Sequence, residues 1–394
     1  MAAAYTDKGS TPGGVLHLAF ELGWSHWKLA FTVGQAQEPR QRTIAARDLA
    51  ALDQEIAKAK KRFQLPDTAP VVSCYEAGRD GFWLHRYLGT RGIANVIVDS
   101  ASIEVPRRKR RAKSDRLDAN KLVRMLLRYQ AGERKVWSII RVPSPAEEDQ
   151  RQLHRELEEL KDDRTRHSNR LKGLLASQGL DLPTVDGTLP AWVEAARLWD
   201  GSALGADLQR RLVRDYERWQ FVHRQVLDLT VQRRRRILCD DTPQVELVRR
   251  LLGLAGIGVN GAWLLVYEFF AWRKLENRKQ VGALVGLTGT PYHSGDCERE
   301  QGISKAGSRR MRKMLVELAW CWLRWQPESA LSRWYVQRFS TGKGPARKVG
   351  IVAVARKLLI ALWRYLERGE IPAGAKVVDW RSKLIKPKRT KPAA

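Results

Sequence analysis

Cysteine is scarce in this sequence, and its placement argues against two kinds of small stabilised domain. The four cysteines are Cys74, Cys239, Cys297 and Cys321, and no two of them have the CxxC spacing of a zinc knuckle. A disulfide framework is equally unsupported, because such frameworks belong to short, cysteine-rich secreted chains. We therefore expect a protein of the reducing cytoplasm.

Long apolar runs are also missing. No stretch reaches the length of about 18 apolar residues that crosses a bilayer, and residues 1–14 lack the apolar segment of a signal peptide. The amphipathic stretches are interrupted by acidic residues, and no lipidation motif is present. We expect a cytoplasmic, nucleoid-associated protein that does not act at a membrane.

Acidic residues are outnumbered, with 43 Asp+Glu against 71 Lys+Arg and a formal net charge of +28 at pH 7. The basic residues come in runs, which favours a polyanionic partner over a uniformly basic surface. Nucleic acid is the simplest such partner. The residues predicted to contact it are Arg107, Arg108, Lys109, Arg110, Arg111, Lys113, Arg233, Arg234, Arg235, Arg236, Lys305, Arg309, Arg310, Arg312 and Lys313.

The first 143 residues have the pattern of an α/β domain. Alternating apolar residues predict a β-hairpin over residues 15–33 and a third strand at 41–45, followed by a helix at 49–63. Buried-type strands at 71–75 and 95–99 flank a helix at about 80–89, and a further helix covers 115–129. This order is the one that an RNase H-like fold requires.

The rest of the chain has helical patterns. Residues 144–242 are predicted to form a helical hairpin or coiled-coil stalk, with long helices over about 145–180 and 191–240. Residues 243–372 are predicted to form a mainly helical domain with a turn-rich loop at 286–295 and a basic helix at 308–325. Residues 373–394 are predicted to be an unfolded basic tail.

Four carboxylates stand where strands end or helices begin in the first domain: Glu21, Glu76, Asp115 and Asp118. Carboxyl ends of strands expose sites in α/β sheets, and Asp115 and Asp118 share one face of a helix. Mg²⁺ or Mn²⁺ prefers such oxygen ligands, and a metal pair can assist phosphoryl transfer. Each acid also has a local alternative, such as helix capping or an ion pair with a neighbouring base. Asp99 is a reserve ligand.

Three segments resemble the insertion-sequence IS110 family of transposases: residues 74–88, the Lys-Ser-Asp-Arg-Leu-Asp-Ala block from Lys113, and residues 286–315 with their His-Ser-Gly and Ile-Ser-Lys-Ala-Gly elements. The resemblance implies a RuvC-like domain with an Asp-Glu-Asp-Asp metal site, a coiled-coil region and a C-terminal transposase domain with a nucleophilic serine. Glu21 departs from the pattern, because the family usually has Asp there.

The resemblance also implies chemistry and partners. Ser294 matches the family's serine-glycine loop and would attack a DNA phosphate to give a phosphoserine. A structured guide RNA would pair with target and donor DNA, and the protein would act as a homo-oligomer. A metal-only RuvC-like nuclease and a non-catalytic basic protein are the alternatives.

Three nearby features have competing explanations. His293 could act as a local base, although a loop histidine more often has no such role. Ser304 and Ser308 are rival hydroxyls, for which helix capping is the better account. The turn at residues 256–258, Gly-Ile-Gly, could bind a phosphate through its amides or could simply pack.

Overall fold

The computed structural model describes residues 14–103, 115–182, 184–294, 297–305, 307–339 and 344–384. Two compact units are present, Met1–Pro143 and Ser144–Ala394, and each is described by itself. The assignment of the first unit to the RNase H-like class stays a prediction at this point, as does the four-part division of the chain.

The first unit contains a five-stranded mixed sheet. Strands β1 (Leu16–Leu22), β2 (His26–Thr32) and β3 (Arg40–Ala45) form an antiparallel meander. Strands β4 (Val71–Glu76) and β5 (Ala94–Val98) add in parallel on the other side of β1, so that the order is β3-β2-β1-β4-β5. These strands confirm the predicted hairpin and the three further predicted strands to within one or two residues.

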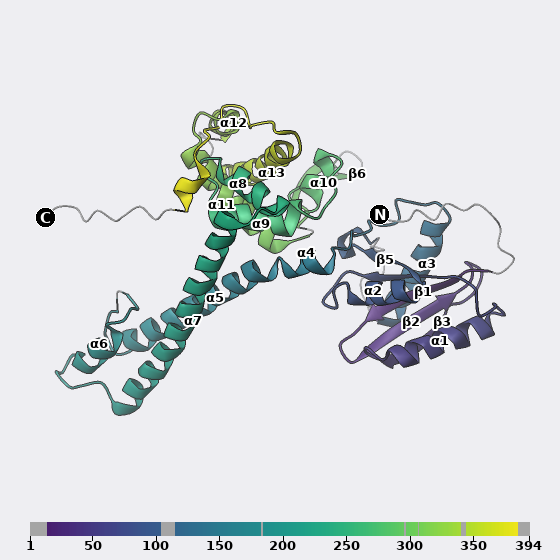
Figure 1. Ribbon diagram of the computed structural model, residues 1–394, viewed down its shortest axis with the longest axis horizontal. Coiled ribbons are helices and arrows are strands. Elements are labelled where there is room, and N and C mark those ends of the chain that lie inside the picture. Colours follow the sequence, from purple (N-terminus) through teal and green to yellow (C-terminus); the bar gives the residue numbers. More distant parts are fainter. Residues whose placement is uncertain are drawn as a thin grey trace. The chain divides into compact units, whose positions relative to one another are not determined.

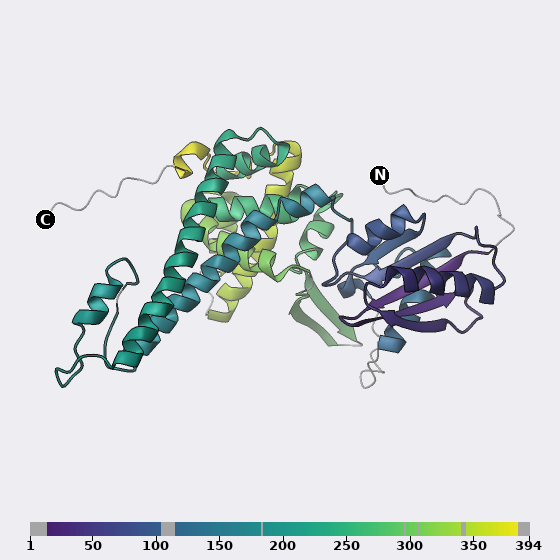
Figure 2. The same ribbon diagram turned by 60° about the horizontal axis from the view of Figure 1, so that its bottom comes forward.

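Helices cover both faces of this sheet (Figures 1 and 2). Alternate residues of β1, such as Leu18 and Phe20, join the core formed with α1 (Leu49–Arg62) and α2 (Trp83–Thr90). The residue between them, Ala19, joins the other core, formed with α3 (Asp115–Gln130). Two-residue alternation along β1 therefore decides which side chains face α3.

The helix predicted at about 80–89 begins three residues later, at Trp83. Gly81 has a left-handed backbone with φ of +65°, which a right-handed helix does not allow. Its carbonyl oxygen accepts a hydrogen bond from Tyr75 Oη at 3.1 Å, so the turn is tied to the end of β4.

The second unit begins with a stalk. The helix predicted from residue 145 divides into α4 (Pro145–Asp149), which starts with a capping box at Ser144 and Glu147, and α5 (Gln152–Ala176). Helix α5 packs along α7 (Ala206–Cys239), and α6 (Leu189–Ala195) covers the far end of this pair (Figure 2). The predicted helical hairpin is confirmed, whereas a coiled coil stays a prediction.

A helical body completes the second unit (Figure 1). It is built from α8 (Pro243–Leu252), α9 (Val259–Leu265), the π-helical segment η3 (Val266–Phe270), α10 (Arg278–Ala283), α11 (Arg309–Trp325), α12 (Ala330–Phe339) and α13 (Gly344–Arg368). Trp263 of α9 and Trp322 of α11 are fully buried in its core. In the described part of the chain, no helix combines the length and apolarity needed to cross a membrane.

Two predictions for this unit are wrong. The expected loop at 286–295 is largely strand β6 (Gly289–Ser294), paired with β7 (Cys297–Ile303). The pairing is irregular between Gly289 and Pro291, a position at which a strand tolerates proline. The expected tail is ordered as far as Leu384: Val377 forms a bridge with Leu254, and η4 (Trp380–Lys383) follows. Residues 385–394 of that tail lie outside the described residues.

The buried ion pair between β3 and α1 gives a test of the first unit. Arg40 donates a hydrogen bond to Glu55 Oε2 at 2.5 Å, and Lys58 donates to Oε1 at 3.0 Å. Burial by itself would raise the pKa of Glu55, but the hydrogen bonds from Lys58 and Arg40 outweigh it and hold the pKa below its ordinary value. The carboxylate therefore stabilises the fold above its unfolded pKa and loses this effect as the pH falls through its folded pKa.

We predict that Glu55→Gln lowers the free energy of unfolding by about 1–3 kcal/mol at pH 7, because Arg40 keeps a buried charge without its anion. The deficit should shrink below about pH 4, where wild type also loses the charge. Denaturant titrations at both pH values measure this. Glu38→Gln, which breaks an exposed pair with Arg124, is the control and should cost less than about 1 kcal/mol. Equal losses from the two variants would contradict the prediction.

Candidate functional site

Two predicted acids lie at the carboxyl ends of neighbouring parallel strands, Glu76 as the last residue of β4 and Glu21 as the last but one of β1. Phe20 of β1 is paired with Tyr75 of β4, and each is followed directly by a glutamate, Glu21 and Glu76. Both glutamates lie two residues after a member of the α3-facing core, Ala19 and Cys74 respectively. Because side chains alternate along a strand, Glu21 and Glu76 lie on the face of the sheet that α3 covers.

Helix α3 brings its first turn to the same end of the sheet. Cys74 Sγ lies 3.8 Å from the carbonyl oxygen of Leu122, midway along the strands. Two residues later, Arg124 pairs at 2.7 Å with Glu38 of the β2–β3 loop, which lies at the amino end of β1. The helix therefore runs antiparallel to β1, so that Asp118, one turn before Leu122, lies toward the carboxyl ends of β1 and β4.

The described side chains differ in exposure. Glu76 is exposed, whereas Glu21 and Asp118 are partly buried. Asp115 is the first residue of α3, but its side chain lies outside the described residues. Asp99 directly follows Val98, which is paired with Glu76, so the reserve acid ends the next strand. Among the side chains that the structure describes, no three His, Cys, Asp or Glu form a group able to hold a metal ion.

Ser294 lies at the end of a two-stranded ribbon. It is the last residue of β6 and is paired with Cys297 of β7, and His293 is paired with Glu298. The side chains of these residues lie outside the described part of the chain. At the base of the ribbon, the amide of Ser304 donates to Thr288 O at 2.9 Å and that of Lys305 donates to Gly286 O at 3.1 Å. These bonds anchor the ribbon to the segment after α10.

The ribbon leads directly into α11. Ser308 is the N-cap of this helix and accepts a hydrogen bond from the amide of Met311, as predicted. Ser304 lies before Gly307 and is not the cap, so that prediction is wrong. A Cβ atom on Gly307, whose φ is +73°, would lie 2.1 Å from the carbonyl oxygen of Leu284. The backbone segments at Gly307 and Leu284 therefore approach so closely that position 307 requires glycine.

Two of the predicted phosphate-binding arginines on α11 have partners inside the protein. Arg310 Nε lies 2.8 Å from Glu158 of the stalk, and its guanidinium also approaches Glu268 at 3.7 Å. Arg312 donates to the carbonyl oxygens of Val285 and Gly307. Both side chains hold the start of α11 in place, so the prediction that they clamp DNA does not fit these contacts. Arg309, Lys313 and Lys305 are exposed and keep that prediction open.

The four consecutive arginines of α7 also differ in burial. Arg233 is only 4% exposed and donates to Asn260 Oδ1 at 2.7 Å, with His154 Nδ1 at 3.2 Å. Burial lowers the pKa of its guanidinium to about 10, which still leaves it charged at neutral pH. Arg233 is therefore a structural residue, and its prediction as a nucleic-acid contact is wrong. Arg234 and Arg235 are exposed, and Arg236 is partly buried. The predicted contacts from Arg107 to Lys113 lie outside the described residues.

The turn at residues 256–258 packs against the end of the chain. Lys383 Nζ donates to the carbonyl oxygens of Leu254 and Ile257 at 2.5 and 2.8 Å, and the amide of Ala255 donates to Lys376 O. A Cβ on Gly256, whose φ is +84°, would lie 3.1 Å from the carbonyl oxygen of Cys321 in α11. These contacts support packing rather than phosphate binding.

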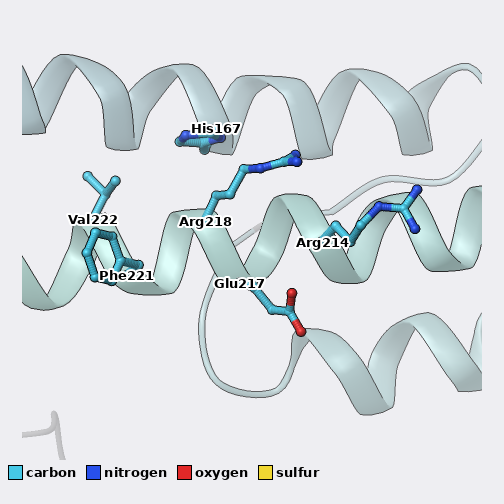
Figure 3. Close-up of a pocket in the computed structure, with 6 residues that line it drawn as sticks. All are labelled: His167, Arg214, Glu217, Arg218, Phe221 and Val222. Atoms are coloured by element: carbon cyan, nitrogen blue, oxygen red, sulfur yellow. The ribbon is translucent and has the colours of Figure 1, made fainter.

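A hollow of about 460 Å³ lies on the side of the stalk. Figure 3 shows its lining, which comes from His167 of α5 and from α7 residues that include Arg214, Arg218 and Phe221. None of the predicted catalytic residues is among its lining residues. We therefore assign no role in the proposed reaction to this hollow.

Comparison with known proteins gives a consistent result. Residues 248–333 match the model of the transposase IS116/IS110/IS902 family. The chain is 38% identical over 379 residues to a Sinorhizobium fredii protein named as transposase y4rJ, covering 92% of this chain and 94% of that one. It is also 26% identical over 179 residues to the transposase for insertion sequence element IS1328 of Yersinia enterocolitica, covering 45% and 51% of the two chains.

The close approach at Gly307 generates a prediction. Gly307→Ala should destabilise the second unit by more than the roughly 1–2 kcal/mol that a left-handed backbone costs alanine, because the Leu284 carbonyl must also move. Gly302→Ala is the matched control, since its φ is +79° but no atom lies within 4 Å of its Cβ position. Thermal unfolding of both variants measures the difference. A loss at position 307 no larger than that at 302 would contradict the contact.

Proposed function

Since the chain belongs to the IS116/IS110/IS902 family of transposases, we propose that it cuts and rejoins the DNA strands of an insertion sequence through a covalent bond to Ser294. The observation that carries the proposal is that Glu21, Glu76 and the first turn of α3 lie toward the same end of one sheet. A second chemical group, the serine at the end of β6, lies in the other unit.

We assign the first unit to the RNase H-like, RuvC-like class. The support is the strand order β3-β2-β1-β4-β5, with a three-stranded antiparallel meander followed by two parallel strands and with helices on both faces. In this arrangement β4 ends in Glu76, and its parallel neighbour, the central strand β1, has Glu21 as its penultimate residue. The fold would thus place carboxylates together without any contribution from flexible loops.

We assign Mg²⁺ or Mn²⁺ to Glu21, Glu76, Asp115 and Asp118. The donor set fits, because hard divalent cations take carboxylate oxygens. When bound, the metal would supply positive charge to the phosphate that is being attacked. Glu21 reaches one methylene further than the aspartate usual in the family, and it lies beside Lys28 in the β1–β2 register.

Ser294 is the proposed nucleophile. Its hydroxyl loses a proton as Oγ forms a bond to phosphorus, and the bond from phosphorus to one deoxyribose oxygen breaks. The released strand end takes up the proton as a hydroxyl. The phosphoserine keeps the energy of the phosphodiester, so a hydroxyl of a second strand can displace Oγ and rejoin the DNA. The anchored base of the β6–β7 ribbon and the fixed start of α11 would orient this serine.

We further propose that a structured RNA selects the DNA and that the protein acts as a homo-oligomer. The high positive charge and the exposed Arg234, Arg235, Arg309 and Lys313 suit contacts with nucleic-acid backbones, which carry little sequence information. Base pairing would then supply specificity for target and donor DNA. Recombination joins two duplexes, which favours more than one copy of the protein.

The experiment that tests this function is denaturing electrophoresis of the protein with labelled donor and target DNA. Wild type should give a protein-linked DNA species in Mg²⁺, and Ser294→Ala should abolish it, while Ser304→Ala, which alters the neighbouring hydroxyl, should retain it. Glu76→Gln or Asp118→Asn should lower the yield by about 10²-fold or more. Hydrolytic nicks without any linked species, unchanged in Ser294→Ala, would instead favour a metal-dependent RuvC-like endonuclease.

The guide is tested by the RNA that co-purifies with the protein. We expect one discrete species, transcribed from DNA that flanks the reading frame, to dominate the sequenced RNA. An Arg234→Gln/Arg235→Gln variant should retain less of it, because two exposed charges are removed. A random sample of cellular RNA in both preparations would contradict the guide proposal and would leave the Ser294 chemistry untouched.

A further inference from the structure

A tryptophan is displayed at the acid end of the first unit's sheet. The turn between β1 and β2 is tight: the amide of Gly23 donates to the carbonyl oxygen of His26 at 3.1 Å, and a Cβ on Gly23 would lie 2.4 Å from that oxygen. Glycine at position 23 thus permits a turn that presents the next residue, Trp24. The indole of Trp24 is 69% exposed, although large apolar side chains are usually covered.

Two arginines flank this indole. The guanidinium carbons of Arg47 and Arg79 lie 5.2 and 4.7 Å from the ring centroid of Trp24. Both arginines are held by one carboxylate, Asp80, at 3.3 and 3.1 Å. The side chain of Asp80 is only 5% exposed, whereas those of Arg47 and Arg79 are 46% and 51% exposed. The buried side chain of Asp80 therefore holds the two arginines in place, while their guanidinium groups and the indole remain accessible to solvent.

The backbone supports the same arrangement. Arg47 adopts a left-handed conformation, with φ of +68°, and donates from its guanidinium to the carbonyl oxygen of Trp24 at 3.4 Å. A non-glycine residue in this region is strained. This conformation places the Arg47 side chain against the turn. Two cations share one anion, so the cluster retains a net positive charge beside an indole that is largely exposed.

We propose that Trp24, Arg47 and Arg79 form a site for an unpaired nucleic-acid base, with the base stacked on the indole and its phosphate held by the guanidinium groups. Aromatic rings stack on every base, and arginines pair with phosphates. The proposal rests on the proposed function. Trp24 follows Glu21 by three residues, and Arg79 follows Glu76 by three, so the site lies at the same end of the sheet as these acids. A strand held here would enter beside the candidate metal ligands.

A purely structural role is the competing account. Cation–π contacts could serve only to stabilise the turn, as they do at many surfaces. That role would need neither the high exposure of the indole nor an excess of cations over the one shared carboxylate. The two accounts also differ in a measurable way, because only a stacking site responds to the presence of a base on the nucleic acid.

The test is photocrosslinking of the full chain in the Ser294→Ala background to short single-stranded oligonucleotides that contain one 5-iodouracil. In this background a failure of the serine chemistry does not affect the readout. We expect a crosslinked peptide that contains Trp24, found by mass spectrometry. DNA and RNA oligonucleotides in parallel distinguish the two sources of an unpaired base.

Affinity measurements complete the test. Trp24→Ala should weaken binding of a short oligonucleotide roughly 5- to 100-fold, and Trp24→Phe should restore most of it. An abasic oligonucleotide should bind wild type and Trp24→Ala equally. Trp199→Ala is the control, since that indole is 93% exposed in the other unit. Crosslinks confined to other residues, or a thermal destabilisation of Trp24→Ala without any change in binding, would overturn the proposal.

Discussion

The parallel pairing of β1 with β4 is the constraint on which the proposed site depends, because it brings two glutamates to the same end of one sheet. Glu21 and Glu76 follow paired residues of β1 and β4, so their Cα atoms are separated by about one strand spacing, roughly 5 Å. The first turn of α3 adds Asp118 to the same face. In a chain with 28 excess positive charges, these acids at one end of the sheet are the basis of the proposed metal site.

The basic residues divide into structural and available groups. Arg155 and Arg310 neutralise Glu268, and Arg310 also pairs with Glu158, which ties the stalk and the start of α11 to one helical body. These contacts fix the helix that follows the Ser294 ribbon. Exposed residues such as Arg309 and Lys313 remain for nucleic acid. Net charge therefore indicates the class of partner, but it does not identify the contacting residues.

Local patterns predicted most elements, and tertiary contacts explain what they missed. Alternation gave β1, and Ser308 was identifiable as a cap because a helical pattern follows it. The β6–β7 ribbon was missed, since Gly289, Pro291 and Gly302 interrupt a mostly polar sequence and only pairing makes it a strand. The burial of Arg233 depends on Asn260, 27 residues later, and no local signal reveals that contact. The spacing of Asp115 and Asp118 predicted that they share one face of α3. That Glu21 and Glu76 are neighbours follows only from the register of β1 with β4.

We propose that the metal held by the acids and the hydroxyl of Ser294 act on the same DNA phosphate. The most direct test of this proposal is formation of the protein-linked DNA from a substrate with a stereochemically pure phosphorothioate at the scissile position. One diastereomer should react poorly in Mg²⁺ and recover in Mn²⁺ or Cd²⁺, because sulfur binds Mg²⁺ weakly and softer metals well. Equal rates for both diastereomers in every metal would show that no metal contacts the phosphate that the serine attacks, and would contradict the account.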